Sequence, residues 1–323
     1  MSGSTLFSIG EALIDMIPSR VGCSFDEVPS FSPRTGGAPA NVCAAFARLG
    51  GKSAFLSQLG NDPFGHKIAR ELEACGIDLS HLAFTDKAST ALAFVSLEED
   101  GSRTFSFYRK PSADLLYSPE QIDPAWFADA FALHFCSVSL VDSPMRYAHL
   151  AAIAAAREAG AIVSFDPNLR EPLWPSLDAA AEQMLWGLKN ADVVKISGEE
   201  AEFLFGCGCE KSAELILNDC GAKLVMITLG SEGCFIKNRA AQCCVPAARV
   251  KAADTTGAGD IFGGSAAYCL LSSGKAPEEL NEEELNAIGR FACAAAGLSV
   301  QRPGGISSVP GKEEILALLA AGD

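Results

Sequence analysis

The sequence has few of the features that mark membrane, secreted or zinc-binding proteins. No run reaches the ~18 apolar residues of a membrane span, and the chain does not open with a basic segment followed by a long apolar stretch. The 12 cysteines include no C-x-x-C pair, and the four histidines show no H-E-x-x-H spacing, which argues against a zinc site. The sequence therefore predicts a cytoplasmic protein with reduced cysteines and no membrane partner.

Positive charge is scarce as well. The chain has 25 Lys and Arg residues against 40 Asp and Glu, a formal net charge of −15. This excess argues against nucleic acid or an anionic membrane as a partner. Apolar residues make up 49% of the 323 residues and charged residues 20%, which is typical of a folded globular chain. The length allows one large domain, with or without a small appendage.

A stretch of small residues, 253–264, follows an extended segment at 242–250 and leads into an alanine-rich helix. Residues with little or no side chain leave backbone N–H groups uncovered at the start of that helix, where the helix dipole favours an anion. These residues are Gly257, Ala258 and Gly259. Asp260 follows directly, and a carboxylate beside an anion site is suited to removing a proton from a hydroxyl group.

Two interpretations of this stretch stay open on its residues alone. In the first it is a phosphoryl-transfer site, where the N–H groups stabilise the moving phosphoryl group and Asp260 activates the attacking hydroxyl. In the second it is an ordinary helix start capped by Asp254 or Thr255. The Walker pattern G-x-x-x-x-G-K-[ST] is absent, so this is not a P-loop protein.

From residue 131 onward, strand-like and helix-like segments alternate. Strands are expected at 131–138, 161–166, 191–196 and 223–228, and helices at 144–159, 176–190 and 211–220, with further helices at 283–297 and 312–321. Such alternation predicts a largely parallel sheet covered by helices on both faces, with ligands beyond the carboxyl ends of the strands. Several polar or small residues fall at or near those ends: Asp15, Asp166, Asn168, Lys195, Glu200, Thr228, Gly230 and Asp260. Their coincidence favours a ligand site more strongly than any one motif.

The N-terminal part adds a second group of candidate residues. Residues 5–17 predict a first strand, in which Asp15 faces either a salt bridge or a ligand. Gly36 and Gly37 let a ligand approach the backbone, and Asn41 on the helix that follows is either a helix-start residue or a sugar contact. Beyond a strand at 55–59, a helix capped by Asp62 is expected to run from Pro63 to Gly76.

A small β lid is expected from residues of about 18–34 and 89–110. The segments 89–97 and 103–109 alternate in polarity around Glu-Glu-Asp-Gly, which predicts a hairpin, and 18–34 predicts a turn or a short edge hairpin. On this lid Phe94, Phe107 and Arg109 either pack internally or touch a substrate. The edges of the lid could pair with a second subunit, which would make a homodimer.

Together these motifs resemble the ribokinase-like (PfkB) sugar kinases, most closely the bacterial fructokinases, over nearly the whole chain. Residues 36–41 (Gly-Gly-Ala-Pro-Ala-Asn) and 254–260 correspond to the two signature regions of the family. Residues 110–114 and 166–170 look like fructokinase versions of its more variable segments. The resemblance implies one domain over 1–323, of α/β ribokinase-like fold, with a mainly parallel sheet flanked by helices and the small β lid.

The resemblance also implies roles for single residues. Asp260 matches the catalytic base, and Gly257, Ala258 and Gly259 match the anion hole. Sugar hydroxyls would meet Asp15, Gly36, Gly37 and Asn41. The nucleotide would meet Asn168, Lys195, Glu200, Thr228, Gly230, Gly233, Gly257 and Gly259. Glu200 would help to organise Mg²⁺ and phosphate, although Ser197 replaces the Asn of the family's N-x-x-E motif. A monovalent cation, usually K⁺, would bind Asp254, Thr256, Ser299, Arg302, Gly304 and Ser308, several through backbone carbonyls.

The function expected from this resemblance is transfer of the γ-phosphoryl group of ATP to a sugar, D-fructose first, giving fructose 6-phosphate. Aminoimidazole riboside and 2-keto-3-deoxygluconate are alternative substrates for the same fold. Specificity would rest on Phe94, Phe107, Arg109 and Arg170, and the two arginines keep an acidic sugar open. A catalytically silent sugar sensor is the alternative from another class, but such a sensor would not need Asp260.

Overall fold

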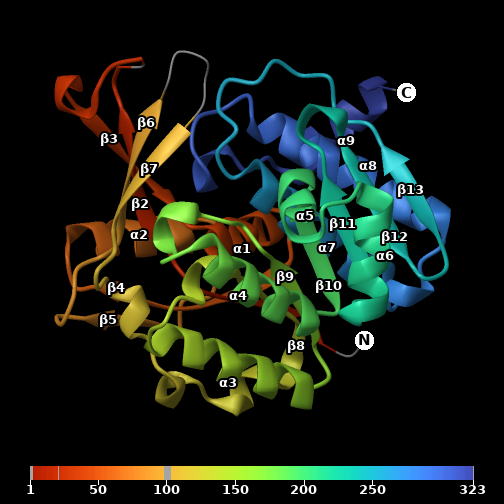
Figure 1. The fold of residues 1–323 in the computed structure, drawn as a ribbon, viewed down its shortest axis with the longest axis horizontal. Coiled ribbons are helices and arrows are strands. Elements are labelled where there is room, and N and C mark those ends of the chain that lie inside the picture. The colour runs from red at the N-terminus through yellow and green to blue at the C-terminus, as the bar shows by residue number, and fades with distance from the viewer. Residues whose placement is uncertain (1–2, 21, 98–102, 323) are drawn as a thin grey trace.

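The computed structural model describes residues 3–20, 22–97 and 103–322, and within them the chain forms two β-sheets (Figure 1). The large sheet has the strand order β13-β12-β11-β10-β9-β8-β1-β4-β5. Every pair from β11 to β5 is parallel, and β12 and β13 add an antiparallel edge. Its strands are β1 (Thr5–Ile9), β4 (Lys52–Gly60), β5 (Leu82–Thr85), β8 (Ala130–Cys136), β9 (Ile162–Asp166), β10 (Val193–Ser197), β11 (Leu224–Thr228), β12 (Cys234–Asn238) and β13 (Gln242–Val245). The α/β class and the mainly parallel sheet are confirmed.

Helices cover both faces of this sheet. Alternate residues of β11 enter opposite cores: Val225 and Ile227 lie in one, Leu224 and Met226 in the other, because successive side chains of a strand point to opposite faces. The first core is closed by α3 (Pro144–Glu158), α4 (Leu177–Lys189), α5 (Gly198–Phe205) and α6 (Cys209–Asp219), and the second by α1 (Ala38–Arg48), α7 (Ala258–Ser273) and α8 (Glu282–Ser299). A third core joins α1, α7 and α8 to α2 (Pro63–Ala74) and α9 (Lys312–Gly322). No described helix is long and apolar enough to cross a membrane.

The small sheet stands at the upper left of Figure 1, with the strand order β3-β2-β6-β7. Its strands are β2 (Leu13–Pro18), β3 (Phe31–Gly36), β6 (Leu92–Leu97) and β7 (Arg103–Tyr108). β6 and β7 are antiparallel, as the hairpin prediction requires, and β2 runs parallel to β6. The predicted turn at 98–101 lies outside the described residues. One face of the sheet carries Leu13, Ala93, Phe105 and Phe107. Phe31, Phe94 and Tyr108 of the sheet form an aromatic cluster with Phe25, which lies in the turn between β2 and β3.

The prediction of a single strand over residues 5–17 is wrong. β1 ends at Ile9 in the large sheet and β2 begins at Leu13 in the small one. The chain turns between them at Gly10, whose φ of 144° is open to glycine. Asp15 therefore lies inside a strand of the small sheet, and not at the carboxyl end of a parallel strand as predicted. The edge hairpin predicted for 18–34 is present: β3 pairs antiparallel with β2 at the edge of the small sheet, and it continues past residue 34 to Gly36.

Several short elements escaped prediction. β5, β12 and the eight-residue helix α5 were missed, and the extended segment expected over 242–250 is a strand only as far as Val245. These elements are too short to show a clear period, and tertiary pairing decides them. The start of α2 was predicted correctly: Asp62 caps it by accepting a hydrogen bond from Gly65 N at 2.8 Å.

Candidate active site

The start of α7 is an uncapped helix terminus. Gly257 is its N-cap residue with φ of 74°, and within the described chain no side chain caps it. The carboxylate of Asp254 instead accepts hydrogen bonds from Thr256 N at 2.9 Å and Gly304 N at 2.8 Å, so capping by Asp254 is wrong. Ala258 N donates to Thr255 O at 3.3 Å, and the amides of residues 259 and 260 lie between it and Ile261 N, which donates the first helical bond to Gly257 O at 2.9 Å. Such amides can bind an anion.

Asp260 lies on the first turn of α7 and is 8% exposed. Its Oδ2 accepts a hydrogen bond from Asn41 Nδ2 at 2.8 Å. Burial, and then the charge of Asp166, raises the pKa of Asp260 to about 7, although the Asn41 hydrogen bond and Lys195 act in the opposite direction. A carboxyl group with this pKa can accept and release a proton near neutral pH, as a general base must.

Asn41 links the two glycine-rich stretches. It sits on α1, and its amide packs against Gly305 and Gly257: a Cβ atom at Gly305 would lie 2.6 Å from Asn41 Oδ1. That oxygen is buried and has no hydrogen-bond partner among the described residues. Asn41 therefore positions Asp260 with one end of its amide and has an acceptor left at the other.

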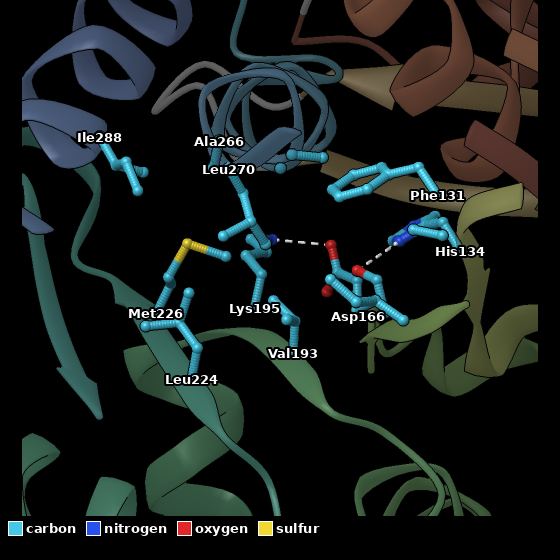
Figure 2. Close-up of a pocket in the computed structure, with 15 residues that line it drawn as sticks. Phe131, His134, Asp166, Val193, Lys195, Leu224, Met226, Ala266, Leu270 and Ile288 are labelled. Atoms are coloured by element: carbon cyan, nitrogen blue, oxygen red, sulfur yellow. Dashed lines mark hydrogen bonds and ion pairs between the residues drawn. The ribbon is translucent and has the colours of Figure 1, made fainter. Parts of the chain in front are cut away.

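Lys195 and Asp166 form a buried ion pair (Figure 2), which lies close to Gly259 on the first turn of α7. Their Nζ and Oδ2 atoms are 2.9 Å apart, and a Cβ atom at Gly259 would lie 2.7 Å from Lys195 Nζ. Burial disfavours the charged lysine, but the charges of Asp166, Glu200 and Asp260 outweigh it and raise the pKa of Lys195. The nearby His134 has its pKa lowered to about 3 by burial and by Lys195, so it stays neutral. The site thus contains a fixed positive charge under α7.

A pocket of about 410 Å³ and a groove of about 1000 Å³ meet at Gly259. Both are lined by Thr228, Gly230, Ser231, Thr255 and Gly259. The groove adds Asn168, Lys195 and Glu200, and the pocket adds Gly233 and apolar residues that include Phe262, Ala296 and Val300. The tertiary structure therefore brings all the residues predicted to bind the nucleotide, except Gly257, around two cavities that meet at Gly259, directly before Asp260 in the chain.

Glu200 has a structural task in addition to lining the groove. Its carboxylate accepts hydrogen bonds from Ser197 N at 2.9 Å and Leu169 N at 2.7 Å, and Ser197 Oγ in turn caps α5 through Glu200 N. Ser197 thus fills the capping position, a role that its short side chain suits. Among the described residues no group of three or more His, Cys, Asp and Glu could hold a metal ion. A divalent ion here would depend on nucleotide phosphates for most of its ligands.

Several of the residues predicted for the sugar lie on or beside one face of the small sheet. Asp15 touches Gly36 so closely that a Cβ atom there would collide with its Oδ2. Asp15, Ala93 and Phe107 are register partners across β2, β6 and β7 and share one face of the small sheet. Arg170, on the loop after β9, lies 5.8 Å from the ring centroid of Phe105. Its charge also reaches Asp260, whose pKa it lowers.

Phe94 and Arg109 do not join that group. Phe94 packs in the aromatic cluster, with ring centroids 5.1 Å from Phe31 and 5.5 Å from Phe25, while its strand neighbour Ala93 faces Phe107. Arg109 is 3% exposed and forms an ion pair with Asp114 inside the molecule. Of the two arginines considered for an acidic sugar, only Arg170 lines the groove.

The predicted cation ligands lie on two loops that Asp254 ties together. The Asp254 carboxylate accepts a hydrogen bond from Gly304 N. The backbone N–H groups of Ala253 and Asp254 also donate to Val300 O, at 2.7 and 3.0 Å. The hydroxyls of Ser299 and Ser308 donate to nearby carbonyls, and Arg302 forms an ion pair with Glu314. Six residues were predicted as ligands: Asp254, Thr256, Ser299, Arg302, Gly304 and Ser308. They can offer backbone carbonyls, the Asp254 carboxylate and the hydroxyl oxygens of Thr256, Ser299 and Ser308, which keep lone pairs when the hydroxyl donates.

Sequence reasoning missed two contributors to this geometry. Asp166 was noted at a strand end but was given no role, and the structure shows it to be the partner of Lys195. Its place at the carboxyl end of β9 was the available signal. Phe105 contacts Arg170, and the alternation of β7 gave no sign of which aromatic residue would do so.

The chain belongs to the pfkB family of carbohydrate kinases, whose family model matches residues 4–312. It is therefore a sugar kinase. It is 41% identical to fructokinase-2 of Solanum lycopersicum over 99% of this chain and 98% of that protein. Among solved structures it resembles the ATP-bound fructokinase of Xylella fastidiosa, with a TM-score of 0.88, 36% identity and 98% of each chain covered. A fructokinase double mutant of Vibrio cholerae O395 with fructose, ADP and potassium ion bound gives a TM-score of 0.88 at 35% identity, over 98% of this chain and 99% of that one.

Proposed function

We propose that this protein transfers the γ-phosphoryl group of ATP to D-fructose and forms fructose 6-phosphate, with Asp260 as the general base. The observation that carries the proposal is the geometry at the start of α7. A buried carboxyl group with a pKa of about 7 lies at an uncapped helix start. It follows Gly259, which lines a nucleotide-sized cavity, and it accepts a hydrogen bond from Asn41, in the segment that begins with Gly36 and Gly37. The fructokinases of tomato, Xylella fastidiosa and Vibrio cholerae support fructose as the sugar.

In the proposed reaction the sugar lies between the Gly36–Asn41 segment and the Arg170 loop, with its primary hydroxyl at Asp260. Ionised Asp260 takes the proton while the hydroxyl oxygen bonds to the γ-phosphorus and the bond to the β-phosphate oxygen breaks, which releases ADP. The amides of residues 259 and 260 and the ammonium of Lys195 stabilise the charge on the transferred group. Mg²⁺ would neutralise the phosphates, with Glu200 at its side of the groove. The small sheet acts as the lid that excludes water.

The test is ADP production from MgATP with fructose, aminoimidazole riboside, ribose and 2-keto-3-deoxygluconate in turn. We expect the highest kcat/KM for fructose. A preference for another of these sugars would keep the mechanism and overturn the substrate. Sugar binding without ADP production would instead favour the silent sensor. Arg109 is paired with Asp114 inside the protein and is not free to bind a carboxylate. We therefore expect 2-keto-3-deoxygluconate, the acidic sugar of the panel, to be a poorer substrate than fructose.

We further propose that K⁺ binds between the loops that Asp254 joins. Carbonyl, hydroxyl and carboxylate oxygens are suited to such a cation, and Gly304 has a φ of 92°, which turns its backbone within the loop. The cation would hold the residues just before the anion-binding amides. Activity in KCl should exceed activity in choline chloride at equal ionic strength; equal rates in the two salts would contradict a K⁺ site.

We also propose a homodimer formed through the small sheet. Phe25 and Tyr108 are 44% and 61% exposed, and Phe94 joins them in one aromatic cluster. Exposed aromatic clusters of this kind are favoured at protein interfaces. Light scattering should give twice the 33.8 kDa chain mass, and Tyr108→Arg should give the monomer. A monomeric wild-type protein at micromolar concentration would contradict the proposal.

We also propose a cytoplasmic location, since the 12 cysteines are free thiols.

A further inference from the structure

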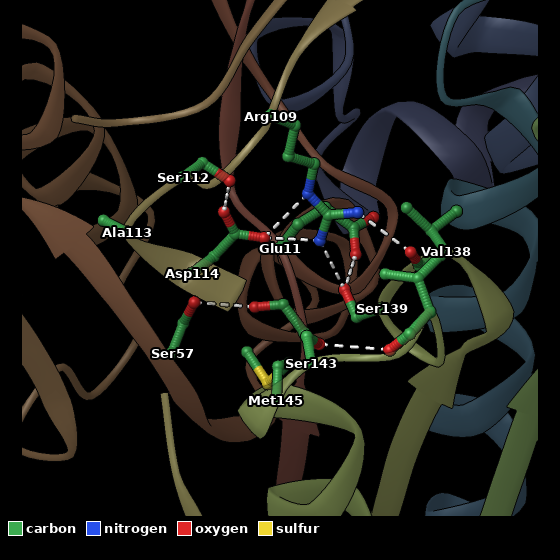
Figure 3. A network of polar contacts seen from close by, with 12 residues as sticks. Glu11, Ser57, Arg109, Ser112, Ala113, Asp114, Val138, Ser139, Ser143 and Met145 are labelled. Carbon is green, nitrogen blue, oxygen red and sulfur yellow. Dashed lines mark hydrogen bonds and ion pairs between the residues drawn. The ribbon is translucent and has the colours of Figure 1, made fainter. Parts of the chain in front are cut away.

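A second buried ionic cluster lies at the base of the small sheet (Figure 3). Glu11, Arg109 and Asp114 are 2%, 3% and 1% exposed. Arg109 Nε donates to Asp114 Oδ2 at 2.9 Å, and its other nitrogens donate to Val138 O and to Ser139 Oγ, each at 2.9 Å. Ser139 Oγ donates in turn to Glu11 Oε2 at 2.7 Å. One continuous network therefore joins the three charged side chains.

This network touches the points where the chain passes between the two sheets. Glu11 lies in the passage from β1 to β2, and Arg109 opens the passage that leaves β7. The remaining Glu11 oxygen, Oε1, accepts a hydrogen bond from Ala38 N at 3.3 Å, directly after Gly37. Gly37 has a φ of 110°, and a Cβ atom there would lie 2.5 Å from Glu11 O. Glu11 thus fixes the glycine pair from the side of the small sheet.

Charge burial of this kind needs a reason beyond stability. Burial raises the pKa of Glu11 although Arg109 and Ser139 act to lower it, so the ionised form pays a desolvation cost. Apolar side chains of the same volume often stabilise a protein equally well. The charged cluster differs from apolar packing in fixing the relative orientation of its members, because a guanidinium binds its acceptors in a fixed planar geometry.

We propose that the Glu11–Arg109–Asp114 cluster is a positioning element for the sugar side of the site. It sets Gly36–Gly37 against the base of β7, so that the small sheet closes over the sugar from a fixed pivot. This inference rests on the proposed function, in which Gly36, Gly37 and Asp15 meet the sugar. Neither Arg109 nor Glu11 touches the substrate in this arrangement, and both act through the segments that they hold.

The experiment compares Arg109→Met, Arg109→Lys and Ser139→Ala with wild type. Ser139→Ala removes the link between Arg109 and Glu11 without removing a charge, so it serves if the arginine variants do not fold. In Arg109→Met and in Ser139→Ala we expect the KM for fructose to rise by about tenfold, which corresponds to the loss of roughly one charge-assisted hydrogen bond. The KM for ATP should stay within about twofold, and Arg109→Lys should recover only part of the loss because it lacks the fork.

The matched control is Asn238→Ala, which removes a buried side chain that donates to Pro277 O and Leu280 O at 3.0 and 2.8 Å. It should lower the melting temperature without changing the KM for fructose. Parallel increases in the KM for fructose and for ATP, in proportion to lost stability, would show that the cluster is only structural and overturn the proposal.

A second measurement separates this proposal from the proposed function. If the wild-type protein phosphorylated no sugar, the proposed function alone would be contradicted. Positioning by the cluster would then be tested by hydrogen exchange of the backbone amides within 37–41 and 103–108. Faster exchange there in Ser139→Ala than in Asn238→Ala supports the pivot, and equal exchange in the two variants overturns it.

Discussion

Two buried clusters in this protein have the same composition and different consequences. One holds Asp166, Asp260 and Lys195, and the other holds Glu11, Asp114 and Arg109. Each combines two carboxyl groups with one cation. In the first, Lys195 lines a groove and lies under the amides that begin α7. In the second, the Arg109 guanidinium donates its hydrogen bonds to acceptors within the protein.

The difference lies in what each cluster leaves available. The pKa of Asp260 is raised to about 7, and Gly259 and Lys195 beside it line the groove. Asp114 accepts bonds from both Arg109 and Ser112, and Glu11 from Ser139 and Ala38. We therefore expect a similar set of charges to support chemistry where one member lines a cavity, and to fix geometry where protein groups make all the hydrogen bonds.

The largest expected effect is at Asp260. Asp260→Asn keeps the size of the side chain and removes the base, so kcat should fall about 10³-fold while binding of ATP, measured by calorimetry, stays within about twofold. Near-normal turnover of this variant would break the comparison, because the first cluster would then have no chemical role.

The same variant should be more stable than wild type at neutral pH. The pKa of Asp260 rises from 3.8 in the unfolded chain to about 7 in the folded protein. Below pH 3.8 Asp260 is protonated in both states and costs the folded protein nothing. Wild type then loses stability as pH rises from 3.8 through 7, because the folded protein must ionise a buried carboxyl group. The gain in unfolding free energy for Asp260→Asn should be on the order of 4 kcal/mol above pH 7 and vanish near pH 4. Denaturant titrations at the two pH values would measure it; a pH-independent difference would contradict the raised pKa.

The second effect is at the ion pair beneath α7. The double variant Lys195→Met/Asp166→Asn removes both charges together, which avoids an unpaired buried charge. Its kcat should fall about 10²-fold through lost stabilisation of the phosphoryl group. The equivalent Arg109→Met/Asp114→Asn variant should leave kcat within about threefold and raise the KM for fructose. Equal losses of kcat in both double variants would erase the distinction between the clusters.

A smaller change is expected in the pH profile of Asn41→Leu. The base acts when ionised, so kcat/KM of wild type should rise with pH through about 7. The Asn41 hydrogen bond lowers the pKa of Asp260, and its loss should move this rise to higher pH. Measuring kcat/KM from pH 5.5 to 9 tests the shift. An unmoved profile with a raised KM would mean that Asn41 serves only the sugar.

The smallest effect is expected at Phe105, which bridges the two sides of the site. Phe105→Leu removes the ring near Arg170, a contact of about 0.5–1 kcal/mol, so the KM for fructose should rise about two- to fivefold with kcat unchanged. The matched control is Phe94→Leu, in the aromatic cluster, which should leave both constants unchanged. The reverse order of effects would place the sugar on the side of that cluster.

Much of the fold could be predicted from the sequence because its signals are local. The alternation after residue 131 indicated most of the parallel strands and the helices between them, and the cap at Asp62 was visible in a few residues. The strand over 5–17 could not be divided correctly. Its apolar pattern continues through Gly10, and only the pairing of Leu13–Pro18 with Phe31–Gly36 shows that a second sheet has begun.

The sequence by itself determined the family, the glycine-rich helix start and the carboxylate that follows it, because these depend on residue type and spacing over short distances. The tertiary structure decided which side chains face one another. It placed Asn41 against Asp260 across 219 positions of the chain, paired Lys195 with Asp166, and enclosed Arg109 where a sugar contact was expected. Burial and pairing arise between distant segments, so no local pattern records them, and they are what set the pKa of Asp260.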